Sequence, residues 1–302
     1  MGGFRRNRAV LVRGIALAVL LVGCRGSGDG AATTTSPAHA SPALGAGRVD
    51  VGGYELSYAC RGEGSPTVLL EAGLGAAGTS AWFSFMGLLD GLDARVCTYD
   101  RAGTGVSDAR PEDAGTPTAA LQAEELHTLL QGAGIDPPYI LVPHSYGGLV
   151  ARVFADRYPD EVGGFVFEDV STAWEIDLWP KWDDSPWIDG EQKVDIQTTK
   201  RQVLHAAPLG SRPTVVVSQS TYDEEGIPDW AAPIFARQQA KLARLGSNVI
   251  HVRADGVGHF IHDERPAVMV AAVRAAVDAV RGTGELPPCG GVFDEDLVSC
   301  LS

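Results

Sequence analysis

The sequence predicts a single α/β domain with a mostly parallel sheet flanked by helices, and three observations support this prediction. From about residue 49 onward, short apolar runs alternate with helical patterns, as in sheets whose parallel strands are joined by helices. Two of the runs, PTVLLEAG and RVCTYD, are short and continuously apolar, which is typical of strands buried on both faces. The chain contains no internal repeat and no second domain of comparable size.

The expected elements follow one another in a regular order. RVDVGGYELSYAC at residues 48–60 reads as a hairpin, because Gly-Gly suits its turn. TAALQAEELHTLLQGAG at residues 118–134 places its leucines on one helical face and ends at a glycine. The other expected strands are residues 66–73, 95–100, 139–145, 163–170, 212–220 and 248–255, and the other expected helices are residues 146–159, 227–246 and 265–282.

Composition and charge exclude several classes of partner. The chain is ordinary for a globular protein, with 45% hydrophobic and 21% charged residues, and its formal net charge is −14. An acidic surface disfavours nucleic acid and anionic lipid as partners. The sequence has no P-loop lysine motif, no H-E-x-x-H and no paired Cys/His spacing, so we expect no nucleotide, cofactor or metal.

The first 24 residues have the features of an export signal. MGGFRRNR is a basic segment, and the apolar run that follows it is too short for a membrane span. The run ends in Leu21-Val22-Gly23-Cys24, which resembles the lipobox of bacterial lipoproteins. The resemblance implies a signal peptide at 1–23, lipidation of Cys24 and anchorage at the outer face of the bacterial cytoplasmic membrane. An ordinary secretory leader with an incidental cysteine is the alternative.

Two segments flank the predicted domain. Residues 24–47 have the Gly, Ser, Thr, Pro and Ala content of a flexible tether. Residues 283–302 form an acidic tail that follows the last expected helix. The α/β domain is therefore expected over residues 48–282.

Four motifs lie within the pattern of strands and helices: LLEAGLG, YDRAGTGVSD, PHSYGG and GVGHFIHDERP. In this order and at these separations they resemble the α/β-hydrolase family over residues 49–282. The resemblance implies the α/β-hydrolase fold, the chemistry of a serine esterase or lipase, and a short lid inserted at about residues 171–212.

Ser145 is the nucleophile that the resemblance implies. It follows the expected strand YILV and opens a helix, which is the context of a nucleophile elbow, and Gly147 and Gly148 let that helix approach the strand. Pro143 departs from the G-x-S-x-G motif, because the family has its first glycine there. Proline fixes φ near about −65° and removes an amide, which the end of a strand tolerates. A catalytically dead elbow is the alternative.

His259 is the expected general base. A serine hydroxyl is a weak nucleophile until a positioned base takes its proton. His259 lies in DGVGHF, between the last expected strand and the last helix, where the resemblance places that base. His262 is expected to be a surface residue beside Asp263 and Glu264.

Two aspartates are open candidates for the acid that orients the histidine. Asp223 follows VVVSQSTY, the position that is commonest in the family, although the usual glycine before the acid is missing there. Asp169 in FVFEDVS follows the preceding strand, a position that a minority of the family uses. Asp229 is a weaker candidate in the same loop as Asp223.

Acyl transfer also needs hydrogen-bond donors for the oxyanion. The resemblance implies the backbone N–H of Tyr146, the residue after the nucleophile. By register, Gly73 in EAGLG matches the family's glycine after the third strand, which makes the N–H of Leu74 the second expected donor.

The expected lid is rich in aromatic and acidic residues. It contains four tryptophans: Trp174, Trp179, Trp182 and Trp187. Four aspartates accompany them: Asp177, Asp183, Asp184 and Asp189. The tryptophans pack the lid onto the domain or form an aromatic wall for an apolar substrate. The aspartates predict an acidic rim that disfavours anionic substrates.

The cysteines after Cys24 suggest two disulfides, since an even number is typical of an exported chain. In the family's strand order, the strand ending near Cys60 lies beside the strand containing Cys97, which implies a Cys60–Cys97 bond. Cys289 and Cys300 bracket the tail, and a bond between them closes it.

Together, these features predict an exported, lipid-anchored serine hydrolase. Its expected reaction is cleavage of a carboxylic ester of a small or apolar substrate through a Ser-His-Asp triad and an acyl-enzyme. A peptidase or amidase of the same fold and a non-catalytic ligand-binding lipoprotein are the alternatives.

Overall fold

A computed structural model describes residues 45–179, 185–222 and 227–301. Within these ranges, nine strands form one sheet in the order β1-β2-β4-β3-β5-β6-β9-β10-β11, and β7 and β8 form a separate two-stranded sheet. The strands from β4 through β3, β5, β6 and β9 to β10 are parallel, and only the pairs at the two edges are antiparallel. The predicted mostly parallel sheet is therefore confirmed.

All the strands except β7, β8 and β11 agree with the expected runs, although β1 begins at Gly45, within the segment predicted to be a tether. The strands are β1 (Gly45–Asp50), β2 (Glu55–Arg61), β3 (Thr67–Glu71), β4 (Arg95–Tyr99), β5 (Tyr139–Pro143), β6 (Val162–Glu168), β7 (Ile188–Asp189), β8 (Gln192–Lys193), β9 (Thr214–Ser218), β10 (Val249–Ala254) and β11 (Val298–Cys300). Every residue of β3, β5 and β9 is buried, as continuously apolar strands between two layers of helices should be.

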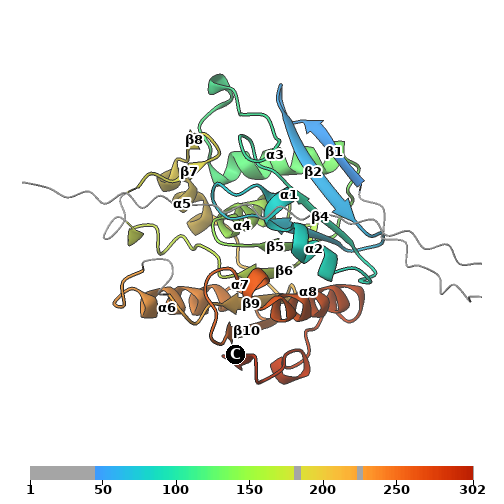
Figure 1. The fold of residues 1–302 in the computed structure, drawn as a ribbon, viewed down its shortest axis with the longest axis vertical. Coiled ribbons are helices and arrows are strands. Elements are labelled where there is room, and N and C mark those ends of the chain that lie inside the picture. The colour runs from blue at the N-terminus through green and yellow to red at the C-terminus, as the bar shows by residue number, and fades with distance from the viewer. Residues whose placement is uncertain (1–44, 180–184, 223–226, 302) are drawn as a thin grey trace, which may run out of the picture. The chain divides into compact units, whose positions relative to one another are not determined.

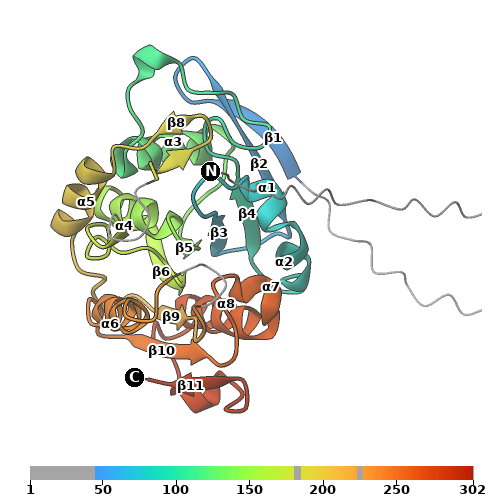
Figure 2. The same ribbon diagram turned by 60° about the vertical axis from the view of Figure 1, so that its left-hand side comes forward.

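The helices cover both faces of the sheet. They are α1 (Gly78–Ala81), α2 (Phe83–Leu88), α3 (Ala119–Gly132), α4 (Gly147–Arg157), α5 (Ile196–His205), α6 (Ala232–Ala243), α7 (Ile261–Glu264) and α8 (Pro266–Arg281), with 3-10 turns at Glu112–Ala114 and Cys289–Gly291. Figure 2 shows α3, α4, α5 and α6 on one side of the sheet and α1, α2, α7 and α8 on the other.

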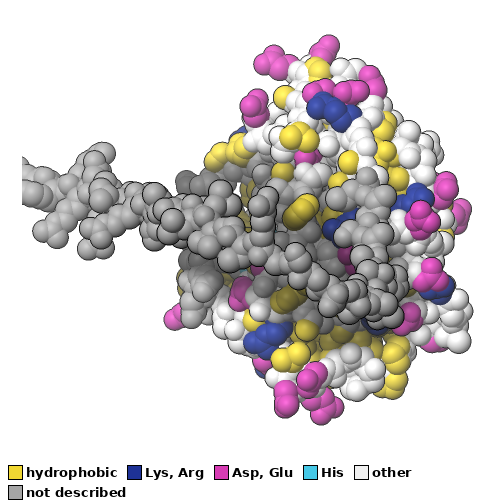
Figure 3. All heavy atoms as spheres, turned by 45° about the vertical axis from the view of Figure 1, so that its right-hand side comes forward, with side chains coloured by type: hydrophobic (Ala, Val, Ile, Leu, Met, Phe, Trp, Pro, Cys, Tyr) yellow, Lys and Arg dark blue, Asp and Glu magenta, His cyan; other side chains and the backbone are white. Residues whose placement is uncertain are grey.

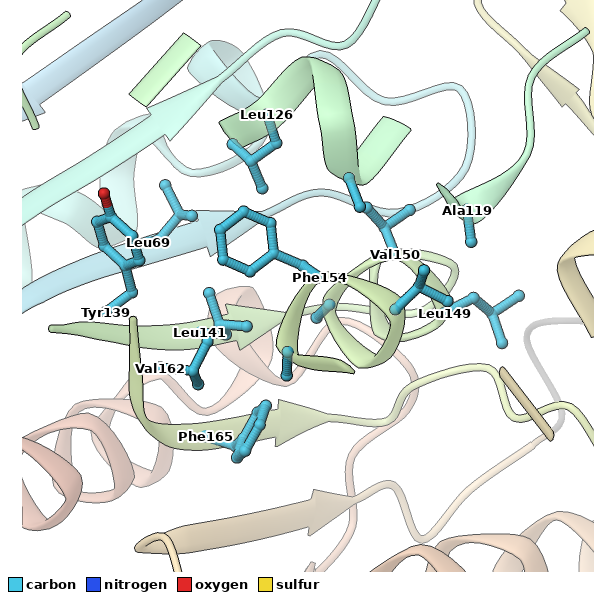
Figure 4. Close-up of a cluster of buried hydrophobic side chains, with 14 of the residues drawn as sticks. Leu69, Ala119, Leu126, Tyr139, Leu141, Leu149, Val150, Phe154, Val162 and Phe165 are labelled. Carbon is cyan, nitrogen blue, oxygen red and sulfur yellow. The ribbon is translucent and has the colours of Figure 1, made fainter. Parts of the chain in front are cut away.

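Each layer of helices has its own hydrophobic core. The larger core joins α3 and α4 to the sheet, and Figure 4 shows Phe154 of α4 between Leu126 of α3 and the sheet residues Leu69 and Leu141. The second core joins Trp82 and the apolar face of α8 to the opposite face of the same strands. The central strands are thus held from both sides, and their carboxyl ends form a rigid edge from which loops project.

The predicted hairpin and both predicted disulfides are present. Gly52 and Gly53 take positive φ in the turn between β1 and β2, and the Asp50 side chain accepts hydrogen bonds from both of their amides. Cys60 and Cys97 face each other across β2 and β4 and are bonded. Cys289 and Cys300 are also bonded.

The sequence pattern missed the short strands β7, β8 and β11 and the helices α1, α2, α5 and α7. β11 pairs with the edge strand β10 and fixes the tail, which the sequence predicted only to be closed by a disulfide. Within the expected lid, β7, β8 and α5 form a small unit beside α3 and α4 (Figure 1). Strands of two or three residues are too short for a period to be read.

The described surface carries many acidic side chains. They are scattered over the face drawn in Figure 3, with fewer Lys and Arg side chains between them. Among the described residues, no helix has the length and apolar character needed to cross a bilayer. The predicted leader and Cys24 lie outside the described ranges.

Candidate active site

Ser145 lies in a sharp turn between β5 and α4. Its φ is 52°, and the only other non-glycine residue with positive φ in the described ranges is Asp169, at 38°. Left-handed backbone is unfavourable for residues other than glycine and is kept where the surrounding structure enforces it, often at functional sites. The two strained residues are the predicted nucleophile and one of the two candidate acids.

Backbone hydrogen bonds hold the turn in this conformation. The Ser145 amide donates to the Glu168 carbonyl (3.3 Å), and the Ser145 carbonyl accepts from the Ser171 amide (2.8 Å). Close packing also requires the glycines that follow the serine. A Cβ at Gly148 would lie 2.4 Å from the Cβ of Val170, and one at Gly147 would lie 2.8 Å from the Ala72 carbonyl oxygen.

Pro143 is accommodated because of its place in the sheet. The paired residues between β5 and β6 end at Leu141, and pairing resumes only at the bridge between His144 and Glu168. Pro143 falls in this gap, so its missing amide removes no pairing there. On the other side of β5, the His144 amide still donates to the Glu71 carbonyl (2.9 Å).

Within the described ranges, the side chain of His259 lies beside that of Asp169. The Nδ1 atom of His259 lies 2.7 Å from Oδ2 of Asp169, and Oδ1 of Asp169 accepts from the Gln219 amide at 3.1 Å. The His259 side chain is 18% exposed and that of Asp169 is 8% exposed, so the imidazole is partly open while its partner is shielded. Asp223 lies outside the described residues, and Asp229 is exposed.

Two cavities meet at Ser145. We call the first the His259 cavity; its volume is about 280 Å³, and its lining includes Ser145, Asp169, Glu175, Gln219, Gln239 and His259. We call the second the Leu74 cavity; its volume is about 180 Å³, and its lining includes Leu74, Ser145, Tyr146, Trp179 and Trp187. The predicted nucleophile is therefore open to two spaces that differ in chemistry.

The predicted oxyanion donors lie on the side of the Leu74 cavity. Tyr146 immediately precedes α4, where helix amides favour developing negative charge. Leu74 lies in the loop after β3, which passes close to the elbow, since a Cβ at Gly73 would lie 3.3 Å from the Cβ of Ser145. Both predicted donors therefore belong to segments that adjoin the nucleophile.

A buried arginine, which sequence reasoning missed, holds the loop after β3. Arg101 is 2% exposed, and its guanidinium donates to Oε1 of Glu71 (2.6 Å) and to the carbonyls of Ala72 and Gly73. Burial raises the pKa of Glu71 even though Arg101 opposes the shift. Arg101 thus binds the backbone of the segment that carries Leu74.

Asp189 of β7 completes this network. Its carboxylate accepts two hydrogen bonds from Arg101 (2.7 and 2.8 Å), one from the Gly75 amide (2.8 Å) and one from Gln122 (2.7 Å). Burial alone would raise the pKa of Asp189, but Arg101 outweighs it and the pKa is lowered. Asp189 was expected on an acidic rim; that prediction is wrong, because the aspartate is 2% exposed and ties the lid to the loop after β3.

The prediction for His262 is also wrong. His262 is 5% exposed, and its ring Nδ1 lies 2.8 Å from Oε1 of Glu168. Burial alone would lower the pKa of His262, but the hydrogen bond and charge of Glu168 outweigh it and the pKa is raised. Its ring packs against Trp82 in a tilted arrangement, with centroids 4.3 Å apart. Glu168 directly precedes Asp169 at the end of β6, and His262 follows His259 by three residues, so the two pairs hold the same strand end.

His144, immediately before the nucleophile, contacts His259 from the other side. Its Nε2 atom lies 3.1 Å from the His259 carbonyl oxygen, and the two rings are 4.4 Å apart. Burial, together with the nearby His259 and His262, lowers the pKa of His144 well below its ordinary value. A neutral His144 therefore packs against the predicted base.

The described tryptophans of the lid occupy two kinds of position. Trp179 and Trp187 line the Leu74 cavity, with centroids 6.0 Å apart. Trp174 instead packs under Lys241, whose Nζ is 5.4 Å from the ring centroid. Trp182 lies outside the described residues. In the described ranges, no group of three or more His, Cys, Asp or Glu side chains is arranged to hold a metal ion.

Comparisons with known proteins agree with this architecture. The profile of a family described as alpha/beta hydrolase fold matches residues 66–186. The crystal structure of a thermophilic esterase from Thermogutta terrifontis superposes with a TM-score of 0.56 at 19% identity, covering 78% of this chain and 99% of that one.

Curated relatives match over shorter lengths or at low identity. The uncharacterized protein YqjL of Bacillus subtilis is 26% identical over 229 residues, which cover 70% of this chain and 84% of YqjL. Methylesterase 9 of Arabidopsis thaliana is 32% identical over 93 residues, which cover 31% of this chain and 36% of that protein. The matches to the other curated relatives compared cover 37% or less of the length of each relative.

Proposed function

The chain has the α/β-hydrolase fold, and we propose that it is a serine hydrolase that cleaves carboxylic esters of small or apolar substrates. One observation carries this proposal. Ser145, held at a φ of 52° at the head of α4, shares a cavity with the hydrogen-bonded pair of His259 and Asp169. A strained serine between strand and helix, beside a histidine oriented by an acid, is the arrangement that nucleophilic acyl transfer requires.

In the proposed mechanism, Asp169 acts through the histidine. Its contact with Nδ1 fixes the proton on that nitrogen and leaves Nε2 as the acceptor. His259 Nε2 takes the Ser145 hydroxyl proton while the oxygen attacks the ester carbonyl. His259 then returns the proton to the departing alcohol oxygen, and the acyl group stays on Ser145.

The amides of Tyr146 and Leu74 bind the oxyanion of the tetrahedral intermediate in this mechanism. Water then attacks the acyl-enzyme, with His259 again as the base. Loss of one oxyanion donor costs roughly 2.7–4 kcal/mol of transition-state stabilisation in serine hydrolases. The network of Arg101 and Asp189 supports the loop that supplies the second donor.

The names of two relatives favour an ester as the substrate. One is a methylesterase and the other a thermophilic esterase. The apolar lining by Trp179 and Trp187 suits an uncharged acyl group.

The test is covalent labelling with a fluorophosphonate, because only an activated serine reacts rapidly. The purified protein is compared with Ser145→Ala and His259→Ala, and the adduct is located by mass spectrometry. We expect labelling of Ser145 in the wild type and none in either variant. A folded wild-type protein that stays unlabelled would contradict the proposal and favour a ligand-binding protein of the same fold.

A second comparison decides the acid. Asp169→Asn and Asp223→Asn are assayed on one ester, with circular dichroism as the measure of folding. We expect kcat to fall in Asp169→Asn and to stay unchanged in Asp223→Asn, because Asp169 contacts His259 at 2.7 Å. Loss confined to Asp223→Asn would reassign the acid.

We also propose that the chain is exported and held at a membrane through a lipid on Cys24. The lipobox-like sequence before Cys24 supports this, and two disulfides suit an oxidising compartment. In a bacterial host, Cys24→Ser should move the protein from the membrane fraction to the soluble fraction and remove the lipid mass from its N-terminal peptide. If the distribution of the protein between the two fractions is unchanged, lipidation of Cys24 is refuted and an ordinary secretory leader is the better interpretation.

A further inference from the structure

The His259 cavity contains polar groups that the proposed mechanism does not use. Glu175, Gln219 and Gln239 line it, and each is only 2–3% exposed. They come from three segments: the start of the lid, the end of β9 and α6. All three side chains contain oxygen acceptors, whereas the Leu74 cavity is lined by no Glu, Asp or Gln among the described residues.

Two of these oxygens have unused hydrogen-bonding capacity. Among the described residues, neither Oε1 of Gln219 nor Oε1 of Gln239 has a hydrogen-bond partner, and both atoms are buried. The amide nitrogen of Gln239 donates to the Val170 carbonyl at 2.7 Å, which leaves its oxygen as the free acceptor. A buried acceptor without a donor is costly, typically about 1–3 kcal/mol, so two lining one cavity point to a donor supplied from outside.

Glu175 adds a potential negative charge to the same lining. Oε2 of Glu175 accepts a hydrogen bond from the Thr172 hydroxyl at 3.1 Å, and no ion pair joins it to a described Lys, Arg or His. No Lys or Arg occurs among the described residues that line the cavity. Burial raises the pKa of Glu175 to about 8, and the nearby Asp169 contributes in the same direction, so the carboxyl is mostly neutral near pH 7.

We propose that the side of the His259 cavity formed by Glu175, Gln219 and Gln239 is a subsite for a protonated primary amine carried by the substrate. An ammonium group has three N–H donors and one positive charge. The subsite offers two unpartnered amide oxygens and one carboxyl, so donors, acceptors and charge balance when the amine binds. On binding, Glu175 releases its proton to solvent and becomes the counter-charge. A hydroxyl has a single donor, which cannot satisfy both amide oxygens, and it brings no charge that would favour the ionised form of Glu175.

The amine belongs to the alcohol half of the ester. This step rests on the proposed function, in which His259 returns a proton to the departing alcohol oxygen. His259 lines the cavity that contains the subsite, whereas Tyr146 and Leu74, the proposed oxyanion donors, line the other cavity. The alcohol half therefore extends toward Glu175, and the acyl half lies against Trp187, while Trp179 lines both cavities.

The test compares two esters of butyric acid that differ only in charge, the aminobutyl ester and the pentyl ester. The quantity measured is the ratio of their kcat/KM values, in which the titration of His259 cancels. We expect the wild type to prefer the aminobutyl ester. Glu175→Gln should lower the ratio by at least about tenfold, because a hydrogen bond to a charged group contributes a binding free energy that corresponds to such a factor. Gln219→Met, which removes one acceptor oxygen, should lower it in the same direction.

Asp177→Asn is the matched control. Asp177 is also a lid carboxylate, but it is 63% exposed at the side chain and pairs with Lys200 outside the cavity. It should leave the ratio unchanged, which excludes a general effect of negative charge. The ratio should also rise with pH from about 6 to about 8 in the wild type, as Glu175 ionises, and stay flat in Glu175→Gln.

The outcomes separate the subsite from the proposed function. Fluorophosphonate labelling of Ser145 in Glu175→Gln shows that this variant is folded and keeps its nucleophile. If Ser145 is labelled but the wild type shows no preference for the amine, the subsite is refuted and the serine hydrolase stands. A Glu175-dependent preference for an amine in the acyl half would overturn the placement. If the wild type is not labelled, the proposed function and the subsite fail together.

Discussion

Asp189→Asn is the substitution that tests how the lid supports the catalytic loop. Asp189 accepts four hydrogen bonds, two from Arg101 and one each from Gln122 and the Gly75 amide. Asparagine has the same shape but no charge, and its amide nitrogen replaces one acceptor oxygen. At least one present donor would then face another donor, and Arg101 would keep only Glu71 as a buried anion.

The magnitude follows from the burial of the pair. Arg101 and Asp189 are each 2% exposed at the side chain, so solvent does not compensate for the lost charge. Breaking a buried ion pair by removing one partner costs about 3–5 kcal/mol. The effect on catalysis comes through the Gly75 amide, which is next to Leu74. Complete loss of the oxyanion donor on that loop would lower kcat by roughly 100- to 1000-fold, which sets the upper limit.

Two measurements check this prediction. Urea unfolding gives the loss of unfolding free energy, and kcat on the pentyl ester is measured under conditions in which circular dichroism shows a folded variant. We expect both to fall in Asp189→Asn. Arg101→Met combined with Glu71→Gln and Asp189→Leu should recover part of the stability, since replacing all three charges of the network leaves none of them buried and unpaired, but it should not recover kcat.

The control is the exposed lid pair of Asp177 and Lys200, whose side chains are 63% and 21% exposed. Asp177→Asn should cost no more than about 1 kcal/mol, as surface ion pairs do. If Asp189→Asn is as mild as this control and keeps full kcat, the anchoring role of Asp189 is refuted.

Three further predictions concern stability. Gly148→Ala should destabilise the chain by about 1–3 kcal/mol, since the new Cβ would lie 2.4 Å from Val170. Because burial raises the pKa of Glu175 to about 8, the folded chain holds an extra proton between the ordinary glutamate value and that pH. The free energy of unfolding should therefore fall by up to about 1.4 kcal/mol per pH unit as pH rises through this window. Replacing Cys289 and Cys300 by serine should cost about 3 kcal/mol by loop entropy and speed hydrogen exchange in β11.

Each of these has a matched comparison. Gly87→Ala, in helix α2, places its Cβ near a single flexible atom of Arg61 at 3.9 Å and should be neutral or slightly stabilising. Glu175→Gln should abolish the dependence of the unfolding free energy on pH in this window. If the dependence is unchanged, a group other than Glu175 causes it. If hydrogen exchange becomes faster in the central strand β5 to the same extent, the cysteine replacements destabilise the whole domain and not only the tail.

Features that depend on local sequence were predictable. The order of apolar runs predicted an α/β sheet, and the strand order implied by the resemblance to α/β-hydrolases placed Cys60 opposite Cys97, as observed. The position of Ser145 between strand and helix and of His259 after the last parallel strand follow from the same order. Each of these residues lies in a short motif, and the order of the motifs along the chain supplied the rest of the prediction.

Features that depend on distant partners were not predictable. Arg101 and Asp189 are 88 residues apart, and their burial depends on a two-residue strand in the lid that has no sequence period. His262 looked exposed because Asp263 and Glu264 follow it, but its partner Glu168 is 94 residues earlier. From sequence alone, a charged residue is predicted to be exposed, because the distant partner that would neutralise it in the interior is not known.

The lid therefore contributes to the site through separate residues with separate roles. Asp189 anchors it through a buried ion pair to the loop after β3, while Glu175 and Trp179 face the His259 cavity. Because the anchor and the cavity lining lie ten or more positions apart, a change in the lining leaves the ion pair intact. Substrate preference can then be altered at Glu175 or Trp179 without moving the loop that carries Leu74. A change at Asp189 would instead reduce hydrolysis of every ester, whatever its alcohol half.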